Sequence, residues 1–258
     1  VAVNPLRGET AIESQISKSS IESISDSTNI TFQASDNITV NNLSETQLNF
    51  AQTKGEISFV ADSDQDGLGS LTIDSENTIN TQGAAVNISG TTINTGDINT
   101  AGGELNLTSS QGFVMTNNLS TANSNTTAES NGGEINVQAQ GDITTGEIDA
   151  SGDFRGGKIT MNAATNIDTK SIHAKGTQSG GNIDITAQGD ITTGEIDASG
   201  DFRGGNITMN AVTDIDTESI HAEGTQSGGG NINLRAGNTL NLRGISTSSG
   251  SLETGNIS

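Results

Sequence analysis

Cysteine, tryptophan and tyrosine are absent from this chain of 258 residues. The absence of cysteine excludes a disulfide framework and a metal site built from thiolates. Without tryptophan or tyrosine, the chain lacks the aromatic platforms on which sugars and single-stranded nucleic acids stack. No hydrophobic run approaches the length of a membrane-spanning helix, so we expect no transmembrane segment.

Positive charge is also scarce. Ten Lys and Arg residues face 31 Asp and Glu residues, which leaves a formal net charge of -21. A surface with this balance repels a phosphate backbone, so we expect no nucleic-acid partner, and it favours solubility. Apolar residues make up only 30% of the chain, which is low for a globule but natural for a thin solenoid whose core is one strip wide.

The chain contains an internal repeat of 24 residues. Four consecutive copies open at glycines spaced by that period, namely Gly133, Gly157, Gly181 and Gly205. The copies alternate in two versions, because GDITTGEIDASGDFRGG occurs twice at a distance of 48 residues, and so do DTKSIHAKGTQSGG and DTESIHAEGTQSGG. A fixed period of this length indicates a solenoid or a repeat array.

Within each copy, apolar and polar residues alternate in three short runs. In the first copy, Ile135, Val137 and Ala139 alternate with polar residues, and shorter runs follow around Ile143 and Ile148. Period-2 alternation predicts strands with one inward face, and a unit of three strands buries that face only by stacking. The sequence therefore predicts an all-β fold, a right-handed parallel β-helix in which each coil adds about 4.8 Å.

Stacking places equivalent residues of successive copies in inward columns. We expect three columns from the first run of each copy, two from the second run, including a threonine column, and one from the third. One isoleucine column is Ile135, Ile159, Ile183, Ile207 and Ile232. Asn166, Asp190 and Asp214 come directly before a strand, where we expect each side chain to bond the backbone of its own turn.

The repeat predicts a single elongated domain. We expect about nine coils over residues 29–258, which gives a rod of about 43 Å. Residues 1–28 lack the repeat and are predicted to form an irregular cap or linker, with one short helical turn near Ser19 to Ser25. Residues 255–258 resemble the start of a tenth coil, so we expect the strand edges at that end of the rod to pair with a further coil or a second molecule.

Several strings resemble filamentous-haemagglutinin-like exoproteins, cyanobacterial members above all. They are NITFQASDNITVNNLS from Asn29, the DSDQDG insert, and the repeated GGNITMNA-type and GDITTGEIDASG-type strings. The resemblance covers nearly all of residues 29–258. It implies a β-helical protein of Gram-negative surfaces, often exported by two-partner secretion, with a role in adhesion or biofilm formation, and it implies no catalytic residues. The secretion domain of that family is not found, so we expect a segment downstream of it.

We therefore expect a structural and adhesive segment rather than an enzyme, located outside the cell or on its outer surface. Its expected partners are second copies stacked head to tail or further coils of a longer chain, and a surface or polysaccharide ligand. The alternative is a polysaccharide-processing β-helix enzyme, because carboxylates such as Glu147, Asp149, Glu195 and Asp197 are typical of the acidic clusters in such enzymes. Their regular duplication argues against it, since catalysis needs one unique cluster in a groove.

Asp62, Asp64 and Asp66, followed by Gly67, form the sharpest candidate for a metal site. Oxygen ligands at alternate positions before a glycine that permits a sharp turn are the chemistry of Ca²⁺-binding loops. Both flanks predict strands, and position 73 is Ile where a helix-flanked loop needs Glu, so this is not an EF-hand. Two hypotheses remain: a single-loop Ca²⁺ site, with Ca²⁺ as the only candidate cofactor, and a solvated acidic turn.

An outward column at 24-residue steps contains Asp149, His173, Asp197 and His221. Members on neighbouring coils lie about 4.8 Å apart, so we expect Asp and His to pair along the rod. One hypothesis is a pH-sensitive or metal-binding surface, and the other is a polar ladder that avoids like charges. The repeat itself duplicates these residues, which favours the second hypothesis.

Two exposed loops, at 153–155 and 201–203, carry the same Asp-Phe-Arg sequence on alternate coils. An aromatic side chain on such a loop suits contact with a partner. The alternative is that each phenylalanine folds over the neighbouring loop and shields the strand ends.

Overall fold

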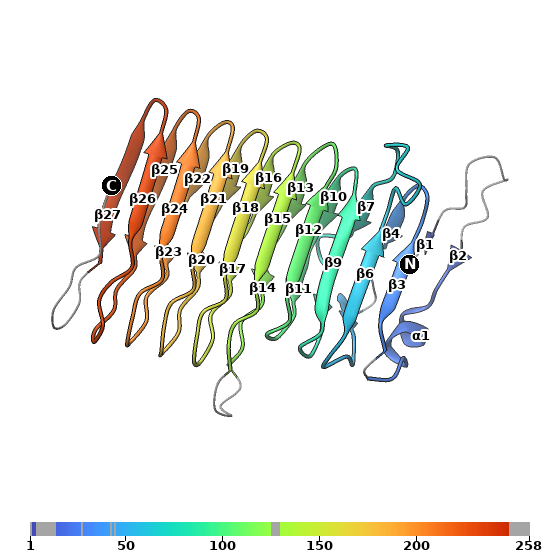
Figure 1. The fold of residues 1–258 in the computed structure, drawn as a ribbon. Helices are drawn as coiled ribbons and strands as arrows, with labels where there is room; N and C mark the ends of the chain where they lie inside the picture. Colours follow the sequence, from blue (N-terminus) through green and yellow to red (C-terminus); the bar gives the residue numbers. More distant parts are fainter. Residues whose placement is uncertain are drawn as a thin grey trace.

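The computed structural model describes residues 2–3, 14–26, 28–41, 43, 45–124 and 130–247. These residues form a rod of stacked coils, with the N-terminal coils (blue) and the C-terminal coils (red) at opposite ends (Figure 1). The predicted fold class is confirmed, because nearly all of the regular structure is strand and the coils pair in parallel to form a β-helix. The right-handed sense stays the prediction of the crossover rule.

A nine-stranded parallel sheet contains the first strand of each coil, which confirms nine coils within the described residues. Its strands pair in register with their copies in the repeat, for example Ile159 with Ile183 and Ile183 with Ile207. The strands are β3 (Ile30–Gln33), β6 (Glu56–Val60), β9 (Ala85–Gly90), β12 (Leu105–Ser109), β15 (Ile135–Ala139), β18 (Ile159–Ala163), β21 (Ile183–Ala187), β24 (Ile207–Ala211) and β26 (Ile232–Ala236).

The second, larger sheet holds the shorter strands of the coils, which merge into one strand in the last two coils. These strands are β4 (Ile38–Val40), β5 (Gln47–Asn49), β7 (Leu71–Ile73), β8 (Thr78–Asn80), β10 (Ile93–Thr95), β11 (Asp97–Asn99), β13 (Val114–Thr116), β14 (Leu119–Ser120), β16 (Ile143–Thr145), β17 (Ile148–Asp149), β19 (Ile167–Thr169), β20 (Ile172–His173), β22 (Ile191–Thr193), β23 (Ile196–Asp197), β25 (Ile215–His221) and β27 (Leu240–Ser246).

The inward columns form the core, as predicted. The five isoleucines of the column from Ile135 to Ile232 are all completely buried. The threonine column is buried too, and its hydroxyls pair between coils: Thr145 Oγ1 lies 2.8 Å from Thr169 Oγ1, and Thr193 Oγ1 lies 2.9 Å from Thr217 Oγ1. The inward columns thus form a core that is continuous along the rod.

The expectation that Asn166, Asp190 and Asp214 bond their own turns is wrong. The backbone N–H of Asp190 donates to Asn166 Oδ1 at 2.9 Å, and that of Asp214 donates to Asp190 Oδ1 at 3.1 Å. Asp214 Oδ1 in turn accepts from the N–H of Thr239 at 2.8 Å. Because the next coil lies only about 4.8 Å away, its N–H is within reach of the side chain, which therefore joins successive coils.

The N-terminal residues depart from the parallel pattern. The predicted helical turn is confirmed as α1 (Lys18–Glu22), whose residue Ile21 is 2% exposed and joins the core. Strand β1 (Ala2–Val3) pairs antiparallel with both β2 (Ser14–Gln15) and β4, so residues before the first coil reach the edge of the larger sheet. These contacts place α1 and β1 at the N-terminal end of the rod (Figure 1).

The last described coil is less well covered than the coils before it. Leu240 continues the column of Ile215, yet Leu240 is 46% exposed whereas Ile215 is completely buried. Leu234 and Ile245 are only partly buried. Within the described part of the chain, β26 pairs only with β24, and β27 pairs only with β25. The predicted beginning of a tenth coil, at residues 255–258, lies outside the described residues.

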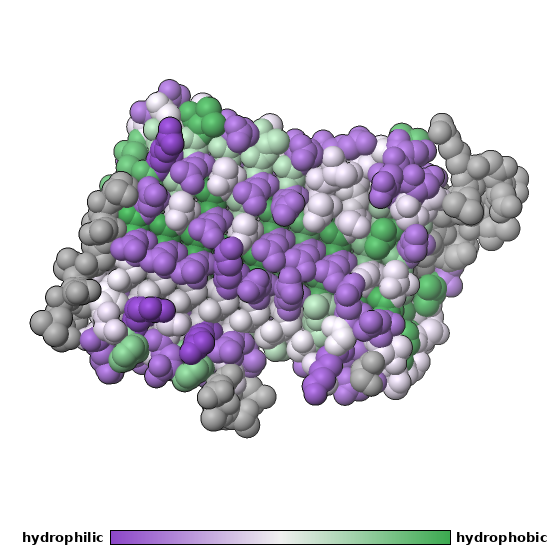
Figure 2. All heavy atoms as spheres, viewed as in Figure 1, coloured by the Kyte–Doolittle hydropathy of each residue, from purple (hydrophilic) through white to green (hydrophobic). Residues whose placement is uncertain are grey.

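On the face shown in Figure 2, hydrophilic side chains form rows that run across the coils. Asn87, Asn106 and Asn136 are paired on successive coils, and their side-chain amides are linked at 2.7 Å and 2.9 Å. The described residues include no helix that is long and apolar enough to cross a bilayer.

Candidate functional site

Two groups of side chains with metal-ligating atoms converge among the described residues. In each group, one ligand atom from each of three residues lies within 4.8 Å of the other two. The first group is Asp62, Asp64 and Asp66, which the sequence singled out. The second is His173, Glu195 and Asp197, in which the sequence pointed to His173 and Asp197 but not to their combination with Glu195.

The loop of the first group lies between β6 and β7 and turns sharply. Asp62 and Gln65 adopt positive φ angles of 55° and 57°, and Gly67 has a φ of 85°. Asp62 Oδ1 accepts the backbone N–H of Gly67 at 2.9 Å, which closes the turn. Asp64 and Asp66 are exposed to solvent, whereas Asp62 is partly buried. The loop therefore offers three carboxylates to a cation that arrives from solvent.

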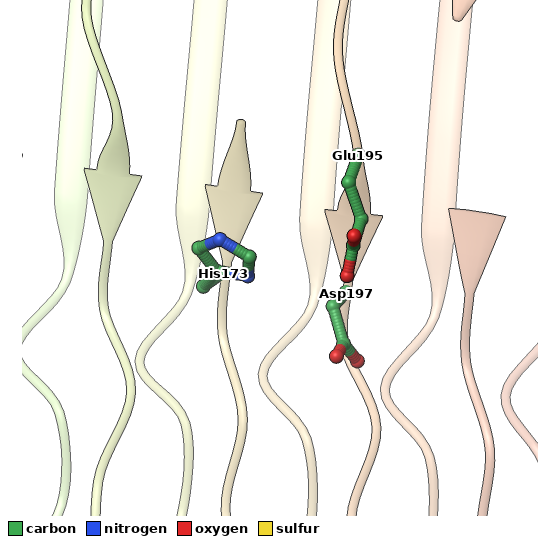
Figure 3. Close-up of side chains that lie close together, drawn as sticks. All are labelled: His173, Glu195 and Asp197. Atoms are coloured by element: carbon green, nitrogen blue, oxygen red, sulfur yellow. The ribbon is translucent and has the colours of Figure 1, made fainter. Parts of the chain in front are cut away.

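The second group joins two neighbouring coils. His173 ends β20, and Asp197 lies directly opposite it in β23, with Glu195 two residues before Asp197 on the same side. Figure 3 shows the three side chains on these neighbouring strands, with one ring nitrogen of His173 on the side that faces β23. The structure therefore confirms that the members of the predicted column lie opposite one another on neighbouring coils. The closest carboxylate to His173 Nε2, however, is Glu147 Oε1, which lies 3.5 Å away on a diagonal rather than along the column.

The two ring nitrogens of His173 have different surroundings. Nε2 faces Glu147 on the preceding coil. Nδ1 is shielded from solvent and has no hydrogen-bond partner among the residues that the structure describes. A shielded nitrogen of this kind needs an explanation, because buried polar groups are nearly always paired.

Asp197 is held as a carboxylate. Its Oδ1 accepts the backbone N–H of Ser199 at 2.9 Å, and its Oδ2 lies 3.2 Å from Lys175 Nζ. Partial burial raises the pKa of Asp197, but the hydrogen bonds from Ser199 and the Lys175 ammonium outweigh it, so that the pKa is held below its ordinary range. The group is therefore negatively charged at neutral pH and available to a cation.

A groove of ≈ 550 Å³ runs across the coils beside this second group. Its floor is a ladder of paired glycines, Gly152, Gly176 and Gly200, and its walls are polar residues such as Asp153, Lys175 and Asp201. A Cβ on Gly152 would lie 2.3 Å from the carbonyl oxygen of Arg155, so the backbones of neighbouring coils pack too closely here for a side chain. The groove is lined by these glycines, by short polar side chains and by Lys175.

No family model, curated protein or solved structure matches this chain. The geometry above is therefore the basis for assigning a role to these groups.

The two Asp-Phe-Arg loops differ in their surroundings. Phe154 is partly buried, with the Arg155 guanidinium 5.2 Å from its ring centroid. Phe202, its copy in the repeat, is 41% exposed. Phe202 is therefore an exposed aromatic side chain, whereas Phe154 is partly covered.

Proposed function

We propose that this chain is a structural and adhesive segment of a secreted or surface-exposed exoprotein, of the filamentous-haemagglutinin-like kind that its strings resemble. The observation that carries the proposal is the uninterrupted stack of nine in-register coils. Such a rod serves to span distance and to display repeated surfaces, because each coil contacts only its neighbours. The role is non-enzymatic, and its location is extracellular or the outer cell surface.

We further propose that the rod extends by stacking on a second copy, head to tail. The nine-stranded sheet ends in β3 on one side and β26 on the other, and each has one partner among the described residues. Unpaired strand edges of this kind are templates for further pairing. The partly exposed Leu234 would pack against the N-terminal region of the next molecule. A contact between two different surfaces continues into a filament rather than closing as a dimer.

Net charge permits this contact. The formal charge of -21 is distributed along the rod, and exposed charges are screened beyond about 8 Å at physiological salt. Two strand edges pair, and inward side chains become covered, at distances shorter than this screening length.

Sedimentation velocity across a concentration series tests the assembly. We expect the unmodified chain to grow into longer species, and Leu234→Lys to abolish this growth, because an inward-pointing charge at a strand edge blocks pairing. The matched control is Leu68→Lys, since Leu68 is 57% exposed on a side loop. Growth that is equal in both variants, or a monomer at every concentration of the unmodified chain, would refute head-to-tail stacking.

The adhesive part of the proposal rests on the groove. Its backbone and carboxylate groups suit the hydroxyls of a polysaccharide, although it lacks the stacking platform that aromatic residues supply. Binding assays with immobilised polysaccharides should show retention that is lost when Asp201→Ala removes a carboxylate from the wall of the groove. Release of new reducing ends during incubation would instead favour the alternative, a polysaccharide-processing enzyme.

We also propose that Asp62, Asp64 and Asp66 bind Ca²⁺ weakly, with a dissociation constant of about 10⁻⁴ to 10⁻³ M, the range of extracellular modules. The convergence of their oxygens supports this proposal. Calorimetry should detect binding at millimolar Ca²⁺ that Asp64→Ala removes. The idea fails if no heat appears, or if Asp64→Ala leaves the heat unchanged.

A further inference from the structure

We propose that His173, Glu195 and Asp197 form a binding site for a divalent transition-metal ion of the zinc class, which ties the sixth coil to the seventh. This inference is independent of the proposed function, because it concerns two coils within one molecule.

The repeat brings the three ligands together. Parallel pairing places His173 opposite Asp197, and alternation along the strand places Glu195 and Asp197 on the same face. Around an ion with ligands at about 2.1 Å in tetrahedral geometry, ligand atoms lie about 3.4 Å apart. The present separations of up to 4.8 Å close to that value by small rotations, chiefly of the solvent-accessible Glu195.

The surroundings of His173 leave one ring nitrogen, Nδ1, able to bind a metal ion. The ring is 18% exposed, and Nε2 lies 3.5 Å from Glu147 Oε1. In the neutral ring, a proton on Nε2 faces this carboxylate and leaves the lone pair on Nδ1. Metal-ligating histidines almost always donate their other ring N–H to a carboxylate, a backbone carbonyl or a water molecule, and Glu147 is the carboxylate placed for that role here. The shielded and unpartnered Nδ1 is thus explained as a ligand atom.

The donor set selects the ion. Imidazole nitrogen suits Zn²⁺, Ni²⁺ and Cu²⁺, whereas Ca²⁺ and Mg²⁺ require oxygen ligands. One nitrogen and two carboxylates satisfy three positions of a tetrahedral ion, and solvent has access to the fourth. The Asp62 loop offers only oxygen ligands, so we expect it to prefer a different class of metal ion from this site.

The second histidine of the repeat provides an internal comparison. His221 occupies the same position 48 residues later, but the strand that follows presents Gly244 and Ser246 opposite Ser219 and His221. The converging groups found among the described residues do not include His221. His173 alone lies between two coils that both carry the Glu and Asp pair, namely Glu147 with Asp149 and Glu195 with Asp197.

Lys175 competes with the ion. Its ammonium lies 3.2 Å from Asp197 Oδ2, and half of its side chain is exposed, so it can swing into solvent when a metal ion binds. Removing its charge should therefore strengthen metal binding, whereas a site elsewhere on the rod would not respond.

The experiment is a calorimetric titration of the full chain with ZnCl₂, at concentrations where sedimentation shows a monomer. We expect one site per chain, an affinity at least tenfold weaker in His173→Asn and in Asp197→Asn, and unchanged affinity in His221→Asn. Glu147→Gln should weaken binding by about tenfold, which is the lower end of the effect of removing a carboxylate that orients a ligand. Lys175→Gln should bind more tightly than the unmodified chain.

Two further measurements make the result decisive. Circular dichroism should show that every variant is folded, and Zn²⁺ should raise the melting temperature of the unmodified chain but not that of His173→Asn. Absence of Zn²⁺ binding, equal losses in His173→Asn and His221→Asn, or complete displacement of Zn²⁺ by equimolar Ca²⁺ would each overturn the proposal. Failure of head-to-tail assembly would leave this titration unaffected, so the two proposals are tested separately.

Discussion

Replacing Ile183 by alanine should strongly destabilise the rod. Ile183 is completely buried and lies between Ile159 and Ile207 of the neighbouring coils. The substitution removes three carbon groups, a loss of about 2.4 kcal/mol at about 0.8 kcal/mol each. The backbone ladder holds the coils about 4.8 Å apart and prevents collapse of the cavity, so the total loss should reach about 3–4 kcal/mol.

The neighbouring Asp184 provides the matched control. It points outward, and its Oδ2 lies 3.4 Å from Lys158 Nζ, with the two side chains 45% and 46% exposed. An exposed ion pair of this kind contributes at most about 1 kcal/mol, so Asp184→Ala should be nearly neutral.

Urea denaturation followed by circular dichroism measures both changes. We expect a large shift of the midpoint for Ile183→Ala and little shift for Asp184→Ala, with similar slopes. Because successive side chains of a strand face opposite sides, equal losses in the two variants would show that the register is displaced by one residue.

Three other substitutions test separate parts of the account. Thr169→Val should destabilise the chain by about 1–2 kcal/mol, since it removes the buried hydroxyl that lies 2.8 Å from Thr145 Oγ1 and donates to the Gly146 carbonyl, whereas Thr144→Val on the exposed face should change little. Phe59→Ala should lower the free energy of unfolding by about 3–5 kcal/mol, because Phe59 is completely buried and stacks on Phe32 with ring centroids 4.8 Å apart. Its control, Phe202→Ala, should be nearly neutral because Phe202 is 41% exposed. Urea midpoints measure the stability of all four variants. The third substitution concerns pH: hydrogen bonds from the Thr165 hydroxyl and the Asn166 N–H hold the pKa of Asp142 below its ordinary range. Its carboxylate therefore stabilises the fold above that range, and this contribution is lost as the pH falls through the lowered pKa. The stability difference between the unmodified chain and Asp142→Asn should be largest near neutral pH and shrink below about pH 4; equal differences at pH 7 and pH 3 would contradict this assignment.

The coil architecture was predictable from the sequence because the repeat is nearly exact. Alternation within each copy determines which side chains face inward, and the 24-residue period determines which residues stack, so the isoleucine columns follow directly. The antiparallel pairing of β1 with β4 was not predictable, because residues 1–28 carry no repeat that would reveal a register.

Side-chain bonding between coils was harder to predict. Asn166 is typical of residues that bond their own turn, and only the stacked geometry shows that the N–H of Asp190 is the better donor. The second metal-ligand group needed two facts at once: the register of His173 against Asp197, and the direction of the Glu195 side chain. The period predicts the register. The direction of the Glu195 side chain depends on its rotamer, which the alternation pattern does not predict.

Fibre diffraction of the concentrated, aligned chain shows whether coils continue from one molecule to the next. This head-to-tail continuation should give filaments with the width of one rod and a reflection at about 4.8 Å along the filament axis, because the strands lie across that axis. Discrete rods of about 43 Å at every concentration, or filaments whose 4.8 Å spacing lies perpendicular to the axis, would contradict it.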